Sequence, residues 1–175
     1  MTAAALLTST WSHWTSPDVV LHRVRCLAPI DLDPCGNAND EVRAAESWRG
    51  LQHPGPHGID GLTSRWLRPG RGLIYANPMF GRKLPDWTAK AVEEGRGGCE
   101  IVMLLPARTD TKWWHDHVVG QAQARCFWRG RLKFGNPPPA ERSTTSTFPS
   151  CIVYWGHRPY AFGAAFEDAG EVVIG

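Results

Sequence analysis

This chain of 175 residues lacks paired cysteines, long apolar runs and a large net charge. Its five cysteines are odd in number and none stands in a Cys-x-x-Cys pair, which disfavours a disulfide framework and favours a reducing compartment. No apolar run approaches the about 20 residues of a membrane-spanning helix. The net charge of +2 excludes a generally basic nucleic-acid coat, so contact with a polyanion requires a local basic patch. We therefore expect a cytoplasmic protein without a membrane partner.

The histidines do not predict a metal site. His115 and His117 lie in a predicted helix, where side chains two positions apart point in different directions. His53 and His57 have no accompanying pair of cysteines. We expect no bound metal and treat these histidines as surface residues.

Short apolar segments alternate with segments of helical spacing. Strands are expected at 28–34, 72–77, 101–105, 151–155 and, at an edge, 171–174. Segments 124–128 and 131–134 are expected to form a hairpin or one strand with a bulge. Helices are expected after a Ser16 cap, weakly at 41–48, at 84–95, and after an Asp110 cap. The alternation predicts an α/β sandwich with a mostly parallel central sheet in a single small domain.

Polar groups follow the ends of three predicted strands, at Asp33-Pro34, Asn77-Pro78 and 106–110. Because ligands of α/β proteins bind beyond the carboxyl ends of the strands, these ends predict a site. The segment Asn77-Pro78-Met79-Phe80 carries an amide oxygen, a carbonyl whose direction proline sets, and an aromatic face. These groups suit the binding of a flat base that bears an exocyclic amino group.

Further motifs extend this pattern along the chain. They are Trp14-Thr15-Ser16-Pro17, Asp31-Leu32-Asp33-Pro34-Cys35, Asp60-Gly61-Leu62 with Trp66, Asn77-Pro78, and segments 104–111, 129–134 and 148–150. In this order, over about Trp11 to Gly156, the chain resembles the phage-type DNA N-6-adenine methyltransferases, which occur in phages and prophages. The resemblance implies a Rossmann-like domain that transfers a methyl group from S-adenosylmethionine to the amino group of adenine in DNA.

The resemblance also implies roles for individual residues. The catalytic residues it implies are Asn77, Pro78 and Phe80. The cofactor-binding residues it implies are Thr15, Pro17, Asp33, Pro34, Cys35 and Asp60. The domain organisation is then a tail at 1–10, a catalytic domain at 11–157 with a mobile loop at 136–150, and a C-terminal extension or edge strand at 158–175.

Two departures from the family pattern leave alternatives open. Met79 stands where the family usually has proline, and Phe80 where it often has tyrosine. A single glycine, Gly36, follows Asp33-Pro34, where the broader superfamily has a glycine-rich turn. The alternatives are methylation of the cytosine amino group and a catalytically silent DNA-binding relative.

DNA contacts are expected from cations beside aromatic residues and beside the third strand end. The candidates are Arg108, Lys112, Arg129, Arg131 and Lys133. The competing interpretation of the 129–133 group is a solvated hairpin edge whose charges prevent aggregation. Dimerisation, which would help a small enzyme to recognise a short DNA site, is left open by the sequence.

Overall fold

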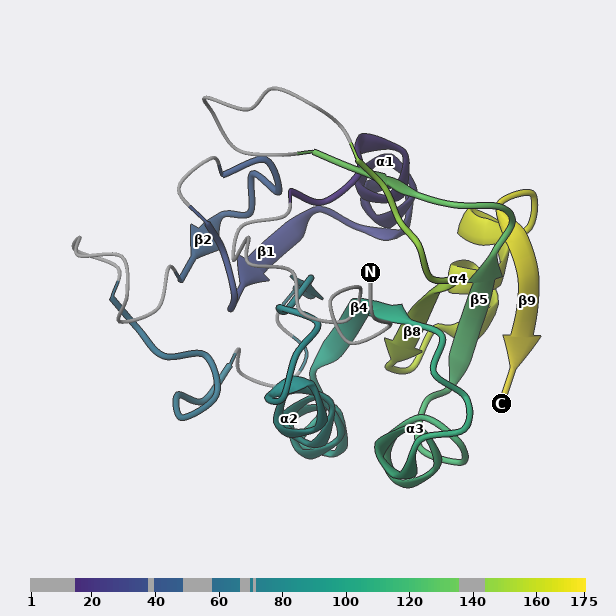
Figure 1. Ribbon diagram of the computed structural model, residues 1–175. Helices are drawn as coiled ribbons and strands as arrows, with labels where there is room; N and C mark the ends of the chain where they lie inside the picture. The colour runs from purple at the N-terminus through teal and green to yellow at the C-terminus, as the bar shows by residue number, and fades with distance from the viewer. Residues whose placement is uncertain (1–14, 38–39, 49–57, 67–69, 71, 136–143) are drawn as a thin grey trace.

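The computed structural model describes residues 15–37, 40–48, 58–66, 70, 72–135 and 144–175. A seven-stranded sheet lies between two pairs of helices (Figure 1). The strands across the sheet are β2 (Glu46–Ser47), β1 (Ile30–Asp33), β3 (Leu73–Ala76), β4 (Glu100–Pro106), β8 (Ser150–Trp155), β5 (Ala124–Trp128) and β9 (Gly170–Ile174). The helices are α1 (Asp18–Leu27), α2 (Leu84–Arg96), α3 (Lys112–His117) and α4 (Pro159–Phe166), and a separate hairpin pairs β6 (Lys133–Phe134) with β7 (Thr144–Thr145).

The sheet is mixed, so the prediction of a mostly parallel sheet is wrong for one half of it. The pairs β2–β1, β1–β3 and β3–β4 are parallel, whereas β4–β8, β8–β5 and β5–β9 are antiparallel. A parallel pair needs a crossover segment, usually a helix. The described residues between β5 and β8 form the β6–β7 hairpin and no helix, and β8 returns directly beside β5.

This topology brings the ends of several strands to one edge of the sheet. The carboxyl ends of β1, β2, β3 and β4 lie there because these strands are parallel. The β4–β8 register pairs Pro106 with Ser150, so the amino end of β8 lies there too. We call this the carboxyl edge of the sheet.

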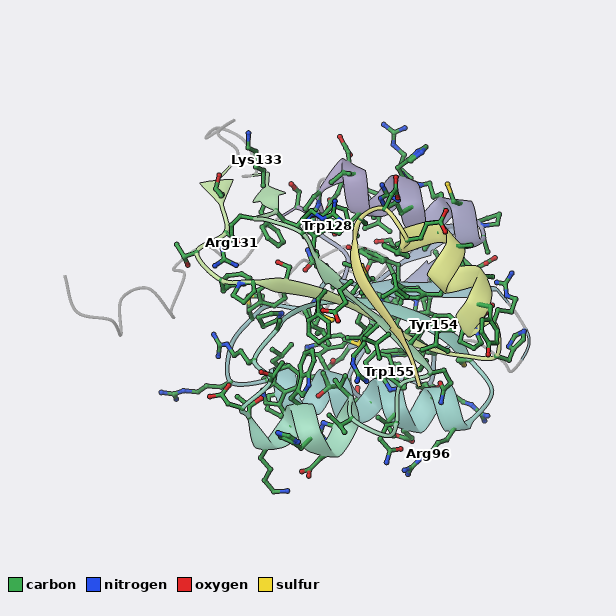
Figure 2. All side chains as sticks on the ribbon, turned by 90° about the vertical axis from the view of Figure 1, so that its right-hand side faces the viewer. Arg96, Trp128, Arg131, Lys133, Tyr154 and Trp155 are labelled. Carbon is green, nitrogen blue, oxygen red and sulfur yellow. The ribbon has the colours of Figure 1, made fainter. Side chains whose placement is uncertain are left out.

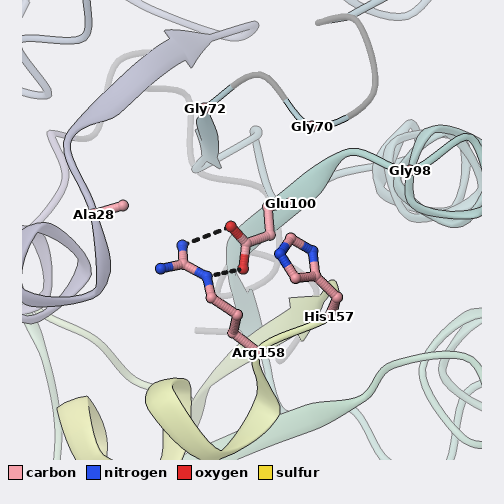
Figure 3. Close-up of a pocket in the computed structure, with 7 residues that line it drawn as sticks. All are labelled: Ala28, Gly70, Gly72, Gly98, Glu100, His157 and Arg158. Carbon is pink, nitrogen blue, oxygen red and sulfur yellow. Dashed lines mark hydrogen bonds and ion pairs between the residues drawn. The ribbon is translucent and has the colours of Figure 1, made fainter.

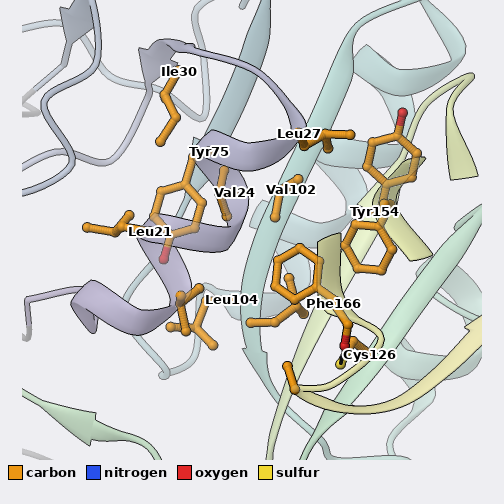
Figure 4. Close-up of a cluster of buried hydrophobic side chains, with 14 of the residues drawn as sticks. Leu21, Val24, Leu27, Ile30, Tyr75, Val102, Leu104, Cys126, Tyr154 and Phe166 are labelled. Atoms are coloured by element: carbon orange, nitrogen blue, oxygen red, sulfur yellow. Dashed lines mark hydrogen bonds between the residues drawn. The ribbon is translucent and has the colours of Figure 1, made fainter. Parts of the chain in front are cut away.

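Alternation along the strands builds one core on each face of the sheet. In β3, Leu73 and Tyr75 join α1 and α4 in a cluster that includes Val24 and Phe166 (Figure 4). The neighbouring Ile74 and Ala76 join the cluster beneath α2 and α3. Burial of each Leu, Val or Ile side chain contributes about 1.5–3 kcal/mol, so these faces hold the carboxyl edge in place.

Most predicted strands are confirmed, but the segment at 41–48 is not helical. It forms a turn and then β2, which pairs in parallel with β1. Asp40 and Arg43 have positive φ angles of 50° and 48°, which a helix cannot contain. The expected pairing of 124–128 with 131–134 is also wrong, since β5 pairs with β8 and β9 while β6 pairs with β7.

The two predicted helix caps differ from the observed ones. The cap residue of α1 is Pro17, and that of α3 is Thr111; neither helix start has a side-chain cap hydrogen bond. Proline presets the backbone at the start of α1, so the serine hydroxyl before it is not needed there. The predictions for residues 1–10, 53–57 and 136–143 lie outside the described residues. Within the described residues, no helix is long and apolar enough to cross a membrane.

Candidate active site

Asn77 stands directly after β3 at the carboxyl edge, and its side-chain amide is held by a residue far away in sequence. Its Nδ2 donates to the hydroxyl Oγ of Ser16 at 3.2 Å. Ser16 is 4% exposed and Asn77 is half-buried. Since the amide nitrogen is engaged, Oδ1 of Asn77 remains as a hydrogen-bond acceptor next to the buried Pro78.

Glu41 links the segment before α1 to the turn that follows β1. Its Oε1 accepts the backbone N–H of Ser16 at 2.8 Å and Nδ2 of Asn37 at 3.1 Å. Its other oxygen, Oε2, is buried and has no hydrogen-bond partner among the described residues. A buried carboxylate oxygen without a hydrogen bond lowers the stability of the fold unless a ligand or another donor binds it. Sequence reasoning missed Glu41 because its segment was read as a weak helix.

Asp33 ends β1 and is a buried carboxyl group, 4% exposed. Its pKa is raised from 3.8 to about 7, mainly by burial and to a smaller extent by the neighbouring carboxyls of Glu41 and Asp40, while a hydrogen bond from the Cys35 N–H opposes the change. Burial also raises the pKa of the Cys35 thiol well above its usual value, and the Asp33 charge adds to this. We call Asp33, Asp40 and Glu41 the acidic cluster; it suits a cationic ligand.

Two glycines allow the loops around Asp33 to approach closely. A Cβ atom on Gly36 would lie 2.1 Å from Oγ of Ser47, the last residue of β2. A Cβ atom on Gly61 would lie 2.2 Å from the carbonyl oxygen of Pro34. The Asp60 turn therefore packs against the end of β1, with Oδ1 of Asp60 accepting the Leu62 N–H at 2.9 Å.

The Ser47 hydroxyl is another buried polar atom that has no hydrogen-bond partner among the described residues. It lies beside the acidic cluster through its contact with Gly36. Nothing in the sequence around Ser47 distinguishes it from a surface serine. Only the pairing of β2 with β1 places it at the carboxyl edge.

Phe80 is half-buried in an aromatic cluster. Its ring lies edge-on to Phe148 at 5.3 Å between centroids and to Phe134 at 6.1 Å. Such edge-to-face pairs contribute about 0.5–1.5 kcal/mol each beyond area burial. Met79 is 61% exposed and is the side chain of this segment that faces solvent. The aromatic cluster thus braces the Asn77–Phe80 segment against the β6 strand.

The expected DNA-contacting cations fall into two groups. Arg131 and Lys133 are exposed around β6, and Figure 2 shows them on the same side of the molecule as Trp128. Arg129, also exposed, precedes them, and its backbone N–H donates to the Ala169 carbonyl at 2.9 Å. These residues form a basic hairpin beside the carboxyl edge.

The second group follows β4. Arg108 is half-buried, whereas Lys112 is exposed at the start of α3 and forms an ion pair with Asp116. The i,i+4 pair is exposed to solvent and contributes little to stability, so Lys112 can exchange this partner for another anion.

The segment before α1 is tied to the basic hairpin. The backbone N–H of Thr15 donates to the Gly135 carbonyl at 3.1 Å, and a Cβ atom on Gly135 would meet the Thr15 hydroxyl at 2.1 Å. Pro17 is buried immediately afterwards. The structure thus brings the 15–17 segment, the ends of β1 and β3, and the Asp60 turn to one edge of the sheet.

A cavity of about 320 Å³ lies at the opposite edge (Figure 3). Its charged groups satisfy one another, because Arg158 binds Glu100 through Nη2–Oε2 at 2.6 Å and Nε–Oε1 at 2.8 Å. Although burial opposes it, the Arg158 guanidinium and the Tyr154 hydroxyl hold the pKa of Glu100 below its ordinary value. This cavity is remote from the strand ends described above. No group of three or more metal-binding side chains occurs in the described part of the chain.

Comparison with known families identifies the class of protein. The model of the DNA N-6-adenine-methyltransferase (Dam) family matches residues 5–162, so this chain belongs to that family. It is therefore an adenine-specific DNA methyltransferase, and S-adenosylmethionine is the methyl donor that the class implies. No curated protein sequence matches the chain.

Proposed function

We propose that the carboxyl edge of the sheet is the methyl-transfer site, with the cofactor at the ends of β1 and β2 and the target adenine at the end of β3. The observation that carries the proposal is the Asn77 amide, whose nitrogen is engaged by Ser16 and whose oxygen is left as an acceptor. The parallel half of the sheet, β2-β1-β3-β4, supports a Rossmann-like arrangement in which ligands bind beyond the strand ends.

The groups around Asp33 fit S-adenosylmethionine, which carries positive charge on its sulfonium and amino groups. The acidic cluster has buried oxygens on Asp40 and Glu41 that lack partners among the described residues, and the Ser47 hydroxyl adds a third such atom. A cation bound there would favour the ionised form of Asp33 and return its pKa toward the ordinary value. When bound, the cofactor supplies an electrophilic methyl group.

Thr15, Pro17, Pro34, Cys35 and Asp60 are proposed to line the rest of the cofactor site. Their support is positional, since all of them stand in segments that meet at the carboxyl edge. The Asp60 carboxylate already accepts the Leu62 N–H, and a carboxylate has further lone pairs for a ligand hydroxyl.

The proposed chemistry at Asn77 is one of orientation. An adenine amino group is a poor nucleophile because its lone pair is delocalised into the ring. Two acceptors, Oδ1 of Asn77 and the carbonyl oxygen of Pro78, would bind its two hydrogens and direct the lone pair at the methyl group. Correct placement of two reactants can lower the barrier by about 7–11 kcal/mol. The surplus proton leaves after the transfer, so no general base is required.

The adenine must leave the duplex stack to reach this edge, which costs a few kcal/mol. Phe80 is proposed to offset part of this cost by stacking on the adenine. Phe134 and Phe148 hold its ring in place. Arg131 and Lys133 are proposed to bind backbone phosphates on the adjacent hairpin, with Arg129, Arg108 and Lys112 as further contacts. Such contacts position the duplex and carry no sequence information by themselves.

The experiment that tests this proposal incubates the protein with unmethylated DNA and isotope-labelled S-adenosylmethionine, and identifies the modified nucleosides by mass spectrometry. We expect N6-methyladenine from the wild type and its loss from Asn77→Ala. Isothermal titration should show that Asn77→Ala still binds the cofactor, because the residue lies at the base end of the site. Labelled N4-methylcytosine in place of methyladenine, or full activity of Asn77→Ala, would contradict the proposal.

A further inference from the structure

We infer that Ser16 is a positioning residue whose hydroxyl fixes the side-chain amide of Asn77 in the orientation that methyl transfer needs. The inference rests on the proposed role of Asn77 and extends it to a residue 61 positions earlier in the chain. An asparagine amide has two orientations of nearly identical shape. One presents an oxygen to the adenine amino group, and the other presents an NH2 donor, which cannot hold a second donor.

The Nδ2–Oγ hydrogen bond of 3.2 Å selects between these orientations if Ser16 acts as the acceptor. The buried phenol of Tyr75 explains why the Ser16 hydroxyl accepts, and does not donate, the hydrogen bond from Asn77. The Tyr75 phenol oxygen is buried without a well-formed hydrogen bond among the described residues, and the Ser16 hydroxyl lies beside it. With its hydrogen directed at Tyr75, the Ser16 oxygen turns its lone pairs to Asn77. Burial strongly raises the pKa of Tyr75, so the phenol stays neutral.

Ser16 is itself held firmly. Its backbone N–H donates to Oε1 of Glu41 at 2.8 Å, and the Pro17 carbonyl that follows accepts the N–H groups of the first turn of α1. Its hydroxyl is not used to cap α1, which has no side-chain cap hydrogen bond. The buried Ser16 hydroxyl therefore does not cap α1 and is available to bind the Asn77 amide.

The test measures the single-turnover rate of methyl transfer with the full chain, saturating labelled S-adenosylmethionine and DNA from a methylation-deficient host. We expect Ser16→Ala to lower this rate about tenfold, as the loss of one hydrogen bond predicts, with a cofactor Kd within about twofold of wild type. Ser16→Thr, which keeps the hydroxyl, should restore most of the rate. The control is Tyr154→Phe, which removes a buried hydroxyl and its hydrogen bond to Glu100 at the opposite edge of the sheet and should leave the rate unchanged.

Three outcomes would overturn the inference: a wild-type rate for Ser16→Ala, equal losses in Ser16→Ala and Ser16→Thr, or an equal loss in Tyr154→Phe. A weakened cofactor Kd with an unchanged rate would overturn it as well, because Ser16 would then contact the cofactor. Asn77→Ala, measured in parallel, distinguishes a failure of the proposed role of Asn77 from a failure of the role inferred for Ser16. If that variant keeps its activity, the proposed role of Asn77 fails; if it is inactive while Ser16→Ala is fully active, only the inference about Ser16 fails.

Discussion

The buried carboxyl of Asp33 leads to a prediction about stability as well as binding. Its pKa is raised to about 7 in the folded protein, from 3.8 in a solvated aspartate. The folded state therefore holds a proton that the unfolded chain releases, and stability is lost as the pH rises through this window. Relative to a carboxyl whose pKa does not change on folding, this shift lowers the unfolding free energy by about 2 kcal/mol at pH 5 and by about 4 kcal/mol at pH 8.

Asp33→Asn removes this cost and keeps an acceptor for the Cys35 N–H. We expect the difference in unfolding free energy, variant minus wild type, to rise by about 2–3 kcal/mol between pH 5 and pH 8. Taking the difference at each pH cancels the other titrating groups. Urea unfolding followed by tryptophan fluorescence measures it, since the chain has nine tryptophans.

The same variant should lose affinity for S-adenosylmethionine, because a neutral amide cannot balance a cationic ligand. Isothermal titration of Asp33→Asn with S-adenosylmethionine at pH 8 measures this loss of affinity. The control is Asp31→Asn, which changes a carboxyl two residues earlier in β1 whose Oδ2 accepts the Leu73 N–H at 3.0 Å. A difference in stability that stays flat with pH would refute the reasoning about burial, and unchanged affinity in Asp33→Asn would refute the placement of the cofactor.

Two further predictions concern other parts of the molecule. Combined replacement of Arg131 and Lys133 by alanine should weaken DNA binding. If each residue binds one phosphate, the slope of log Kd against log salt concentration should fall by roughly 2. The control is Arg96→Ala, which lies on a distant surface in Figure 2 and should leave the slope unchanged. Arg158→Met should lower the unfolding free energy at pH 7, because Glu100 is left buried and charged, and should not change the methylation rate. We expect a loss of about 2 kcal/mol, less than the about 3–5 kcal/mol of a fully buried pair, because the Arg158 side chain is 38% exposed. The loss should shrink on acidification, since the folded-state pKa of Glu100 is depressed and its contribution exists only above the pKa of the unfolded chain. A constant loss across pH, measured by urea unfolding, would contradict this origin.

Apolar runs and breakers in the sequence predicted most of the sheet. Segments such as 101–105 and 151–155 are apolar on both faces and too short for a typical helix, which indicates buried strands. The direction of β8 could not be predicted, because apolar content does not encode whether a strand runs parallel or antiparallel to its neighbour. The error at 41–48 arose because helical propensity there is overridden by two residues with positive φ angles and by pairing with β1.

The candidate site was predictable where polar groups directly follow strands, as at Asp33 and Asn77. Its other members were not, because they are defined by contacts between distant segments. Glu41 and Ser47 come to the acidic cluster only through the β1–β2 pairing, and Ser16 reaches Asn77 across 61 residues. A helix-capping rule assigned the Ser16 hydroxyl to the wrong partner, since it considers only the local backbone.

The backbone link between Thr15 and Gly135 joins the basic hairpin to the segment that precedes α1. If a ligand of one of these segments alters the other segment, the two binding events are coupled, and linkage requires the coupling to be equal in both directions. If duplex DNA tightens cofactor binding through this link, the cofactor must tighten DNA binding by the same factor. Such coupling favours the complex of enzyme, DNA and cofactor over the enzyme with either substrate alone.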